Sequence, residues 1–192
     1  MAGLALLLLF ANLGPALSQV TDLESWEFFA SKENSYIGGR TTNQAHSGSA
    51  SGFLKSESKV KLSQHAILAQ KISAQDISSK RIVLEGFLKV TNVEGWAGLW
   101  MRIDDENGTV LEFDNMAEQP VRATTSWQPY SLELNVPPEA SELHFGALLA
   151  GSGQVFVDDL EITTRGRALK VKNLKRRIRS LPTEAQNMGF EN

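Results

Sequence analysis

The 192-residue sequence contains no cysteine. This absence excludes disulfide bonds, cysteine nucleophiles and zinc sites built on thiolates. It also excludes a lipid-modified cysteine as an N-terminal anchor. A folded domain of this length is therefore stabilised by its apolar core alone, which is feasible for one domain of this size.

Long apolar runs are missing beyond the first twenty residues, so no later window predicts a membrane-spanning helix. The apolar run at residues 4–10 is too short to cross a bilayer, and small residues follow it at Ala16 and Ser18. This order is typical of a signal peptide that is cleaved before Gln19, and a buried N-terminal helix is the alternative. We expect residues 1–18 to be a signal peptide and the mature protein to be secreted or periplasmic.

Groups that would carry catalysis are scarce. Histidine occurs three times, and there is no Gly-x-Ser-x-Gly nucleophile motif. Glu85, Glu112 and Glu133 could in principle pair as glycosidase carboxylates, but isolated acids on strands usually face solvent. The sequence therefore favours a protein that is not an enzyme.

Basic residues are few in most of the chain and concentrated near its end. Eight of the 19 lie between Ile162 and Thr183, where there is no acidic residue: Arg165, Arg167, Lys170, Lys172, Lys175, Arg176, Arg177 and Arg179. Residues 1–164 hold 11 basic and 20 acidic residues, a formal net charge of −9. A body of that charge argues against nucleic-acid binding by the folded part.

Apolar residues alternate with polar ones along several segments of the chain. The clearest runs are residues 82–90, 97–103, 130–136 and 143–149. A period of two predicts β-strands, and about eight short strands without an amphipathic helix between them predict an all-β antiparallel sandwich or jelly roll over residues 19–164.

Turn residues separate the predicted strands. Asn107-Gly108 predicts a type I′ hairpin turn, and Pro137-Pro138 predicts the end of a strand. Residues 26–39 show no alternation and predict a loop-like segment. Residues 165–192 are expected to form a basic linker or tail, in which a short helix over residues 168–181 is the less favoured alternative.

Several sequence blocks occur together in an order that resembles a known module. They are residues 95–102 (GWAGLWMR), 113–116 (FDNM), 124–130 (TTSWQPY) and 151–159 (GSGQVFVDD). Over residues 21–164 the chain resembles bacterial jelly-roll domains of the galactose-binding-like, carbohydrate-binding-module-like type. Such domains occur alone or beside hydrolases and peptidases, and some are labelled transcriptional regulators. The last residues, 187–192 (NMGFEN), resemble the opening of another such module, so the tail is either the start of a further module or a remnant of one.

Four residues form the candidate ligand site. Trp96 and Trp100 fall on one face of a predicted strand with Arg102 next in line, and His144 lies on a later strand. Indole rings stack on the apolar face of sugars, and an adjacent arginine donates hydrogen bonds to hydroxyl groups. The alternatives are that the two indoles are core residues and that His144 is structural, because large aromatic side chains are most often buried.

The resemblance also implies a metal site. In many jelly rolls of this type an acid near the N-terminus and an acid of a late strand hold a structural Ca²⁺, which here would be Glu24 and Asp158. Alternatively, Asp158 and Asp159 terminate the strand and face water.

Taken together, the residues and the resemblance predict a secreted, non-catalytic module that binds a glycan or another polar ligand. The alternative is an accessory domain that packs against a neighbouring hydrolase, peptidase or regulatory domain and binds no small ligand of its own.

Overall fold

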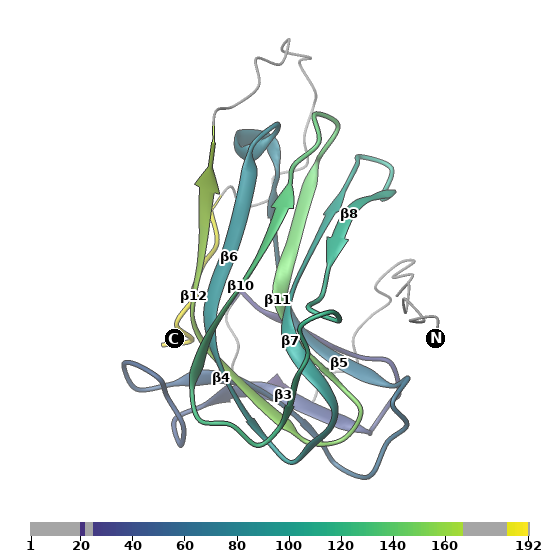
Figure 1. Cartoon of the computed structure of the whole chain (residues 1–192), viewed down its shortest axis with the longest axis vertical. Coiled ribbons are helices and arrows are strands. Elements are labelled where there is room, and N and C mark those ends of the chain that lie inside the picture. Colours follow the sequence, from purple (N-terminus) through teal and green to yellow (C-terminus); the bar gives the residue numbers. More distant parts are fainter. Residues whose placement is uncertain (1–19, 22–24, 167–183, 192) are drawn as a thin grey trace.

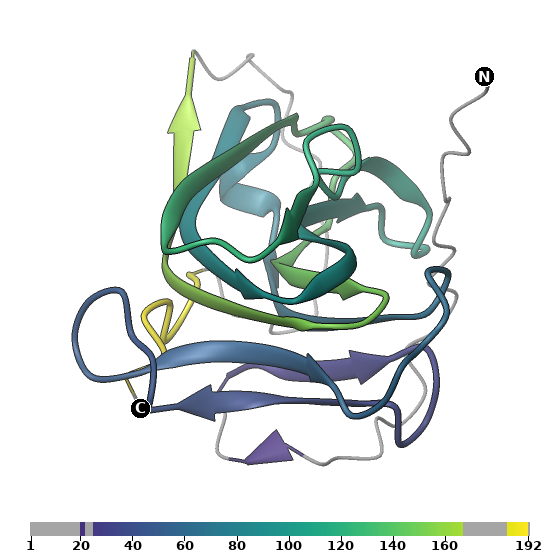
Figure 2. The ribbon, with the colours of Figure 1, turned by 60° about the horizontal axis from the view of Figure 1, so that its bottom comes forward.

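The computed structural model describes residues 20–21, 25–166 and 184–191. These residues form two sheets that pack face to face (Figures 1 and 2). The first, sheet A, runs in the order β1 (Val20–Thr21), β3 (Tyr36–Thr41), β4 (Ser51–Ser56), β12 (Gln154–Arg165), β6 (Arg81–Thr91) and β10 (Gln128–Asn135). The second, sheet B, runs in the order β2 (Glu27–Ala30), β5 (His65–Ser73), β11 (Glu142–Ala150), β7 (Val93–Asp104) and β8 (Val110–Asp114), and β9 (Val121–Ala123) also pairs with β7.

The strand pairing confirms the predicted antiparallel β-sandwich. Of the described ladders, only the two-residue pairing of β1 with β3 is parallel. The one helix among the described residues is the 3₁₀ turn η1 (Gln75–Ile77). No helix in this part of the chain has the length and apolar character needed to span a membrane.

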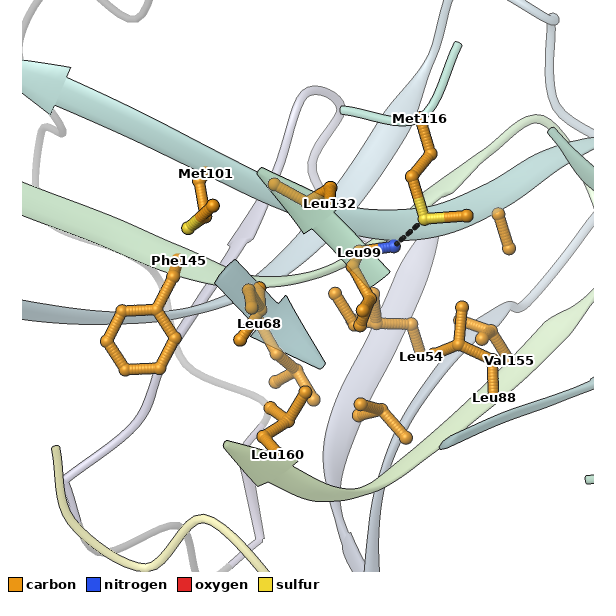
Figure 3. Close-up of a cluster of buried hydrophobic side chains, with 14 of the residues drawn as sticks. Leu54, Leu68, Leu88, Leu99, Met101, Met116, Leu132, Phe145, Val155 and Leu160 are labelled. Atoms are coloured by element: carbon orange, nitrogen blue, oxygen red, sulfur yellow. Dashed lines mark hydrogen bonds between the residues drawn. The ribbon is translucent and has the colours of Figure 1, made fainter. Parts of the chain in front are cut away.

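The core lies between the sheets and is built from the alternating residues (Figure 3). On β7, Ala97, Leu99, Met101 and Ile103 are all buried, and they face inward beside the residues of β11 with which they pair. The backbone N–H of Leu99 also donates to the Met116 sulfur at 3.1 Å (Figure 3). Met116 lies between β8 and β9, the two strands that pair with the same edge of β7. The period-two pattern thus identified the inward face of this strand correctly.

The loop between β7 and β8 differs from the predicted turn. Of Asn107 and Gly108, Gly108 alone has a positive φ, of 78°, whereas a type I′ turn needs two. The Asp105 carboxylate instead accepts the backbone N–H groups of Asn107 and Thr109, at 2.8 and 2.9 Å. The loop is therefore closed by hydrogen bonds to the Asp105 side chain, and Asn107 does not need the positive φ that a type I′ turn requires.

Residues 26–39 are also different from the prediction, because they contain β2 and β3. The alternation is absent there since β2 has four residues and β3 contains Gly38 and Gly39. A Cβ at Gly38 would lie 2.5 Å from the Phe28 ring, so the glycine permits the close approach of that ring to β3.

Residues 184–191, which the sequence placed in the tail, pack against the sandwich beside β12 and β4 (Figure 1). Phe190 is fully buried and its ring stacks on Trp26, with centroids 4.7 Å apart. Arg40 donates to the carbonyl oxygens of Phe190 and Glu191, at 2.7 and 3.0 Å. The end of the described chain therefore supplies part of the core of this module.

Candidate functional site

The four residues predicted as a ligand site lie on the outer face of sheet B, away from the core. Trp96, Trp100 and Arg102 are alternate residues of β7, so their side chains project to the face opposite Leu99. His144 of β11 is the direct partner of Arg102 in the β7–β11 ladder. The structure therefore places all four predicted residues on one face of sheet B, with Arg102 and His144 as neighbours and Trp96 about 20 Å from them along β7.

Trp100 packs on the sheet instead of projecting from it. Its indole N–H donates to the carbonyl oxygen of Leu68 on β5, at 3.2 Å, and 2% of the residue is exposed. The residue opposite Trp100 on the intervening strand β11 is Gly146, where an added Cβ would collide with the Leu68 carbonyl oxygen that accepts the indole N–H. This geometry matches the packing alternative for Trp100.

A second apolar cluster surrounds Trp100 on this outer face. It is separate from the core and consists of Ile67, Ala69, Trp100, Leu148 and Ala150, with Phe29, Trp96 and Phe113 partly buried against it. Trp96 is thus half-buried where Trp100 is fully buried. Of the two predicted indoles, Trp96 keeps the accessible surface that stacking on a ligand requires.

Charged side chains lie on the same face as the aromatic ones, at the end of β7 and the start of β11. Arg102 donates to the Asp104 carboxylate at 2.8 Å, and both side chains are buried. The His144 Nε2 atom lies 3.4 Å from Asp104 Oδ2 and 3.3 Å from Glu142 Oε2. Lys71 of β5 adds an ion pair to Glu142 at 3.6 Å. The outer face therefore combines aromatic surface with hydrogen-bond donors and acceptors.

Asp104 and Glu142 were not identified from the sequence. The signal was available for Asp104, because the alternation that places Trp100 and Arg102 on one face also places Asp104 there. Glu142 could not be found in the same way, since its position depends on the β11–β7 register, which sets it opposite Asp104.

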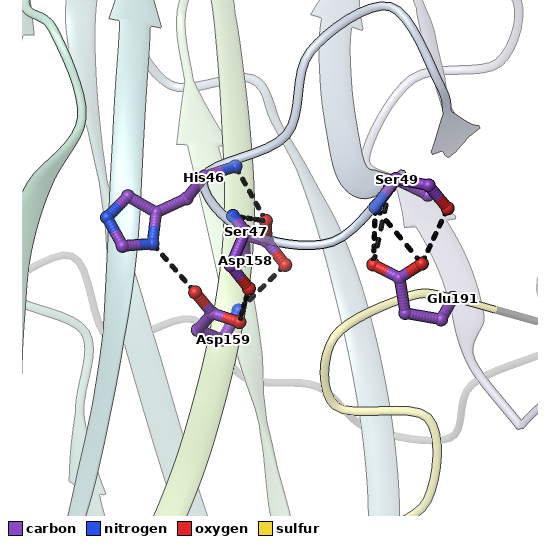
Figure 4. A network of polar contacts seen from close by, with 7 residues as sticks. His46, Ser47, Ser49, Asp158, Asp159 and Glu191 are labelled. Atoms are coloured by element: carbon purple, nitrogen blue, oxygen red, sulfur yellow. Dashed lines mark hydrogen bonds and ion pairs between the residues drawn. The ribbon is translucent and has the colours of Figure 1, made fainter.

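A polar network on sheet A contains the acid predicted to bind calcium (Figure 4). Asp158 is fully buried beside a bulge in β12, and its carboxylate accepts N–H groups from His46, Ser47 and Asp159 at 2.8–3.2 Å. Burial raises the pKa of this carboxyl, and the three N–H donors act in the opposite direction. The other predicted ligand, Glu24, lies outside the described residues, so the calcium site stays a prediction.

The outer face of sheet A carries an aromatic cluster of its own. The His46 ring stacks on Phe87 at 3.5 Å, and its Nδ1 atom lies 2.7 Å from Asp159. Trp127 lies 5.8 Å from His46 and 6.4 Å from Phe156, centroid to centroid. Because His46 belongs to the loop that Asp158 and Asp159 hold, these contacts attach that loop to the sheet.

A pocket of about 550 Å³ opens at one end of sheet A. Its lining includes Arg81 and Arg165, which pair with Glu133 and Glu85 of the same sheet. None of the described residues that line it is aromatic. The pocket therefore lacks the stacking surface that the outer face of sheet B offers.

Comparison with solved structures identifies the architecture. The family 22 carbohydrate-binding module of Clostridium thermocellum Xyn10B superposes with a TM-score of 0.51 and 11% identity, over 78% of this chain and 91% of the module. The xylan-binding domain of Paenibacillus barcinonensis Xyn10C gives 0.50 and 14%, over 71% and 85%. The chain shares the β-sandwich fold of these carbohydrate-binding modules. A bacteriophage CBA120 tailspike protein shares the fold at a TM-score of 0.56 and 14% identity, over 73% of this chain and 19% of its own.

This carbohydrate-binding-module fold is a galactose-binding-like β-sandwich, so the comparisons confirm the resemblance drawn from the sequence blocks. Identities of 11–14% establish the fold and leave the ligand open.

A sequence relative adds a different association. An uncharacterised HTH-type transcriptional regulator, YbfP of Bacillus subtilis, is 32% identical over 169 residues, 88% of this chain. The chain spans 57% of the length of that relative. No protein-family model matches the chain. The described residues, whose one helix is η1, contain no helix-turn-helix.

Proposed function

We propose that this chain is a non-catalytic module that binds a glycan on the outer face of sheet B. The observation that carries the proposal is that one face of sheet B holds the half-buried Trp96 at one end of β7 and, about 20 Å further along, a polar group whose accessible members are Glu142 and Lys71, 25% and 36% exposed. A sugar ring presents an apolar C–H face to an indole and its hydroxyl groups to charged donors and acceptors, so an extended glycan of several sugars along β7 uses both kinds of side chain. The carbohydrate-binding modules that share the fold support this class of ligand.

Binding to soluble polysaccharides tests the proposal. The full chain is run in native gels that contain xylan, galactan, mannan or mixed-linkage β-glucan, and we expect retardation by at least one of them. Trp96→Ala should weaken that binding about tenfold, the loss expected for one stacked ring and its contacts. Thermal melts of the variant should remain near those of the parent, because Trp96 is half-buried.

Trp127→Ala is the matched control, since Trp127 is also half-buried but lies on the outer face of sheet A. Retardation should persist in this variant. No retardation by any polysaccharide would reject the glycan proposal. Weakened binding in Trp127→Ala with normal binding in Trp96→Ala would move the site to sheet A.

A second candidate function rests on the similarity to the Bacillus subtilis protein YbfP. If the chain is the sensory or accessory part of a longer regulatory protein, it packs against a neighbouring domain, and no glycan is needed. The 32% identity to a protein named as a transcriptional regulator favours this candidate. Failure of glycan binding, together with a stable complex between the chain and the remaining region of such a protein, would support it.

Export of the chain is part of the first candidate. We propose that residues 1–18 are removed on secretion, because of the apolar run at residues 4–10 and the small residues Ala16 and Ser18. N-terminal sequencing of protein recovered from the medium or periplasm should then begin at Gln19. An intact Met1 on the exported protein would contradict this.

A further inference from the structure

Three side chains with potential metal-ligand atoms lie close together at the end of β7 and the start of β11. Asp104 and Glu142 are direct partners in the antiparallel ladder, and His144 is two residues further along β11. One carboxylate oxygen from each acid and a ring nitrogen of His144 all lie within 4.8 Å of one another.

Two buried atoms of this cluster have no hydrogen-bond partner among the described residues. They are Nε2 of His144 and Oδ1 of Asp104, and their side chains are 6% and 4% exposed. A buried polar atom that is not hydrogen-bonded costs free energy, so such atoms in a native protein usually have a water, ion or ligand as partner. Both atoms belong to groups that bind metal ions.

The spacing of the cluster fits an ion better than a hydrogen bond. The His144 Nε2 atom is 3.4 Å from Asp104 Oδ2 and 3.3 Å from Glu142 Oε2, both longer than a good N–H to oxygen bond. Two ligands of a tetrahedral ion with bonds of about 2.0–2.1 Å are separated by about 3.3–3.4 Å. The His144 nitrogen is therefore already at the distance from each of the two carboxylates that a bound ion would impose.

Two neighbouring cations hold the carboxylates in place. Arg102 donates to Asp104 Oδ2 at 2.8 Å, and Lys71 lies 3.6 Å from Glu142 Oε2. Metal-binding carboxylates are commonly hydrogen-bonded by outer groups in this way, which fixes their orientation. The same cations offset the negative charge of the acids when no ion is bound.

From these observations we propose that Asp104, Glu142 and His144 bind a divalent transition-metal ion of the zinc class. One imidazole and two carboxylates suit such an ion, whereas Ca²⁺ requires six to eight oxygen ligands. Three protein ligands leave one coordination position of a tetrahedral ion open. If the proposed glycan function holds, a sugar hydroxyl completes this position; the metal site itself does not depend on that function.

Titration calorimetry with ZnCl₂ on the chelator-treated full chain, without glycan, tests the site. We expect one ion per chain with a dissociation constant in the micromolar range or below. His144→Gln should weaken zinc binding at least tenfold, and His46→Gln, which changes a histidine on sheet A, should not. With Co²⁺ the parent and His46→Gln should show visible d–d absorption that His144→Gln lacks.

If His144→Gln does not fold, Glu142→Gln replaces it, because the Glu142 side chain is 25% exposed and its loss disturbs packing less. Absence of zinc and cobalt binding by the folded parent, or unchanged zinc binding in the His144 and Glu142 variants, overturns the proposal. Because no glycan is present, failure here and failure of glycan binding are separate results.

Discussion

Tyr36 on β3 shows how burial acts on a single ionisable side chain. Its phenol donates to the carbonyl oxygen of Gly151 at 3.1 Å, and 3% of the residue is exposed. Burial raises the pKa of Tyr36 from 10.0 to about 12, and burial also raises the pKa of Tyr130. These are the two tyrosines of the chain, so tyrosinate absorbance reports on them alone.

We expect the tyrosine absorbance of the folded Tyr130→Phe variant to titrate at about pH 12, where only Tyr36 contributes. Since the unfolded state loses the Tyr36 proton first, near pH 10, stability should be unaffected below that pH and should fall as the pH rises from 10 towards 12. Urea denaturation at a series of pH values measures the effect. Titration of Tyr36 at its ordinary pKa in the folded variant would show that the phenol is open to water.

Single residues of the site were predictable to different degrees. The period of two placed Trp96, Trp100 and Arg102 on one face, because side-chain direction on a strand follows from sequence spacing alone. The burial of Trp100 depends on the neighbouring strands, through Gly146 opposite it and the Leu68 carbonyl beyond. Contacts of that kind are set by register, which the alternation of one strand does not determine.

At the scale of elements, strands with strong alternation were predictable and others were not. β10 and β7 follow the predicted runs, whereas β5 does not, because apolar residues occupy both of its faces, Leu68 on the inner and Ile67 on the outer one. The packing of residues 184–191 was not predictable either, since it joins the end of the described chain to Trp26 before β2, Arg40 of β3 and Ser49 before β4. Contacts between such distant segments leave no local pattern in the sequence.

Phe190 of residues 184–191 packs directly against Gly52 of β4, and the energetic coupling of these two residues can be measured. A Cβ at Gly52 would lie 2.6 Å from the Phe190 ring. We expect Gly52→Ala to cost about 1–3 kcal/mol in the parent, because the added methyl displaces the ring. Phe190→Ala should cost about 3–5 kcal/mol as a large buried ring is lost.

In the double variant most of the cost of Gly52→Ala should disappear, because the obstructing ring is gone. The coupling energy from urea denaturation should therefore be at least about 1 kcal/mol. Gly38→Ala is the control, since its added methyl meets Phe28 instead, and its cost should be unchanged in the Phe190→Ala background. Additive costs at Gly52 and Phe190 would contradict the seating of the segment on β4.

For the molecule as a whole, basic residues are concentrated in one stretch of the sequence. Residues 1–164 carry a formal charge of −9, and eight basic residues without an acid lie between Ile162 and Thr183. The relative named as an HTH-type regulator raises the question of DNA binding, and the described residues of this chain form no helix-turn-helix. Attraction to phosphate groups is therefore expected from the basic segment and not from the sandwich.

We predict that any DNA affinity of the full chain is non-specific and comes from the basic segment. With eight cations available, the slope of log K against log salt should not exceed about 7 in magnitude. Fluorescence anisotropy with a labelled duplex, at about 50–200 mM salt, measures this slope.

Replacing Lys175, Arg176 and Arg177 by Gln should lower the magnitude of the slope by about 3, at about 0.9 per lost phosphate contact. The same change at three exposed lysines of the body, Lys55, Lys59 and Lys61, should leave it unaltered, since the body carries a net negative charge and Lys55 and Lys59 pair with Glu57 and Glu94. A steeper slope, or an effect of the body lysines, would place a nucleic-acid interface on the sandwich.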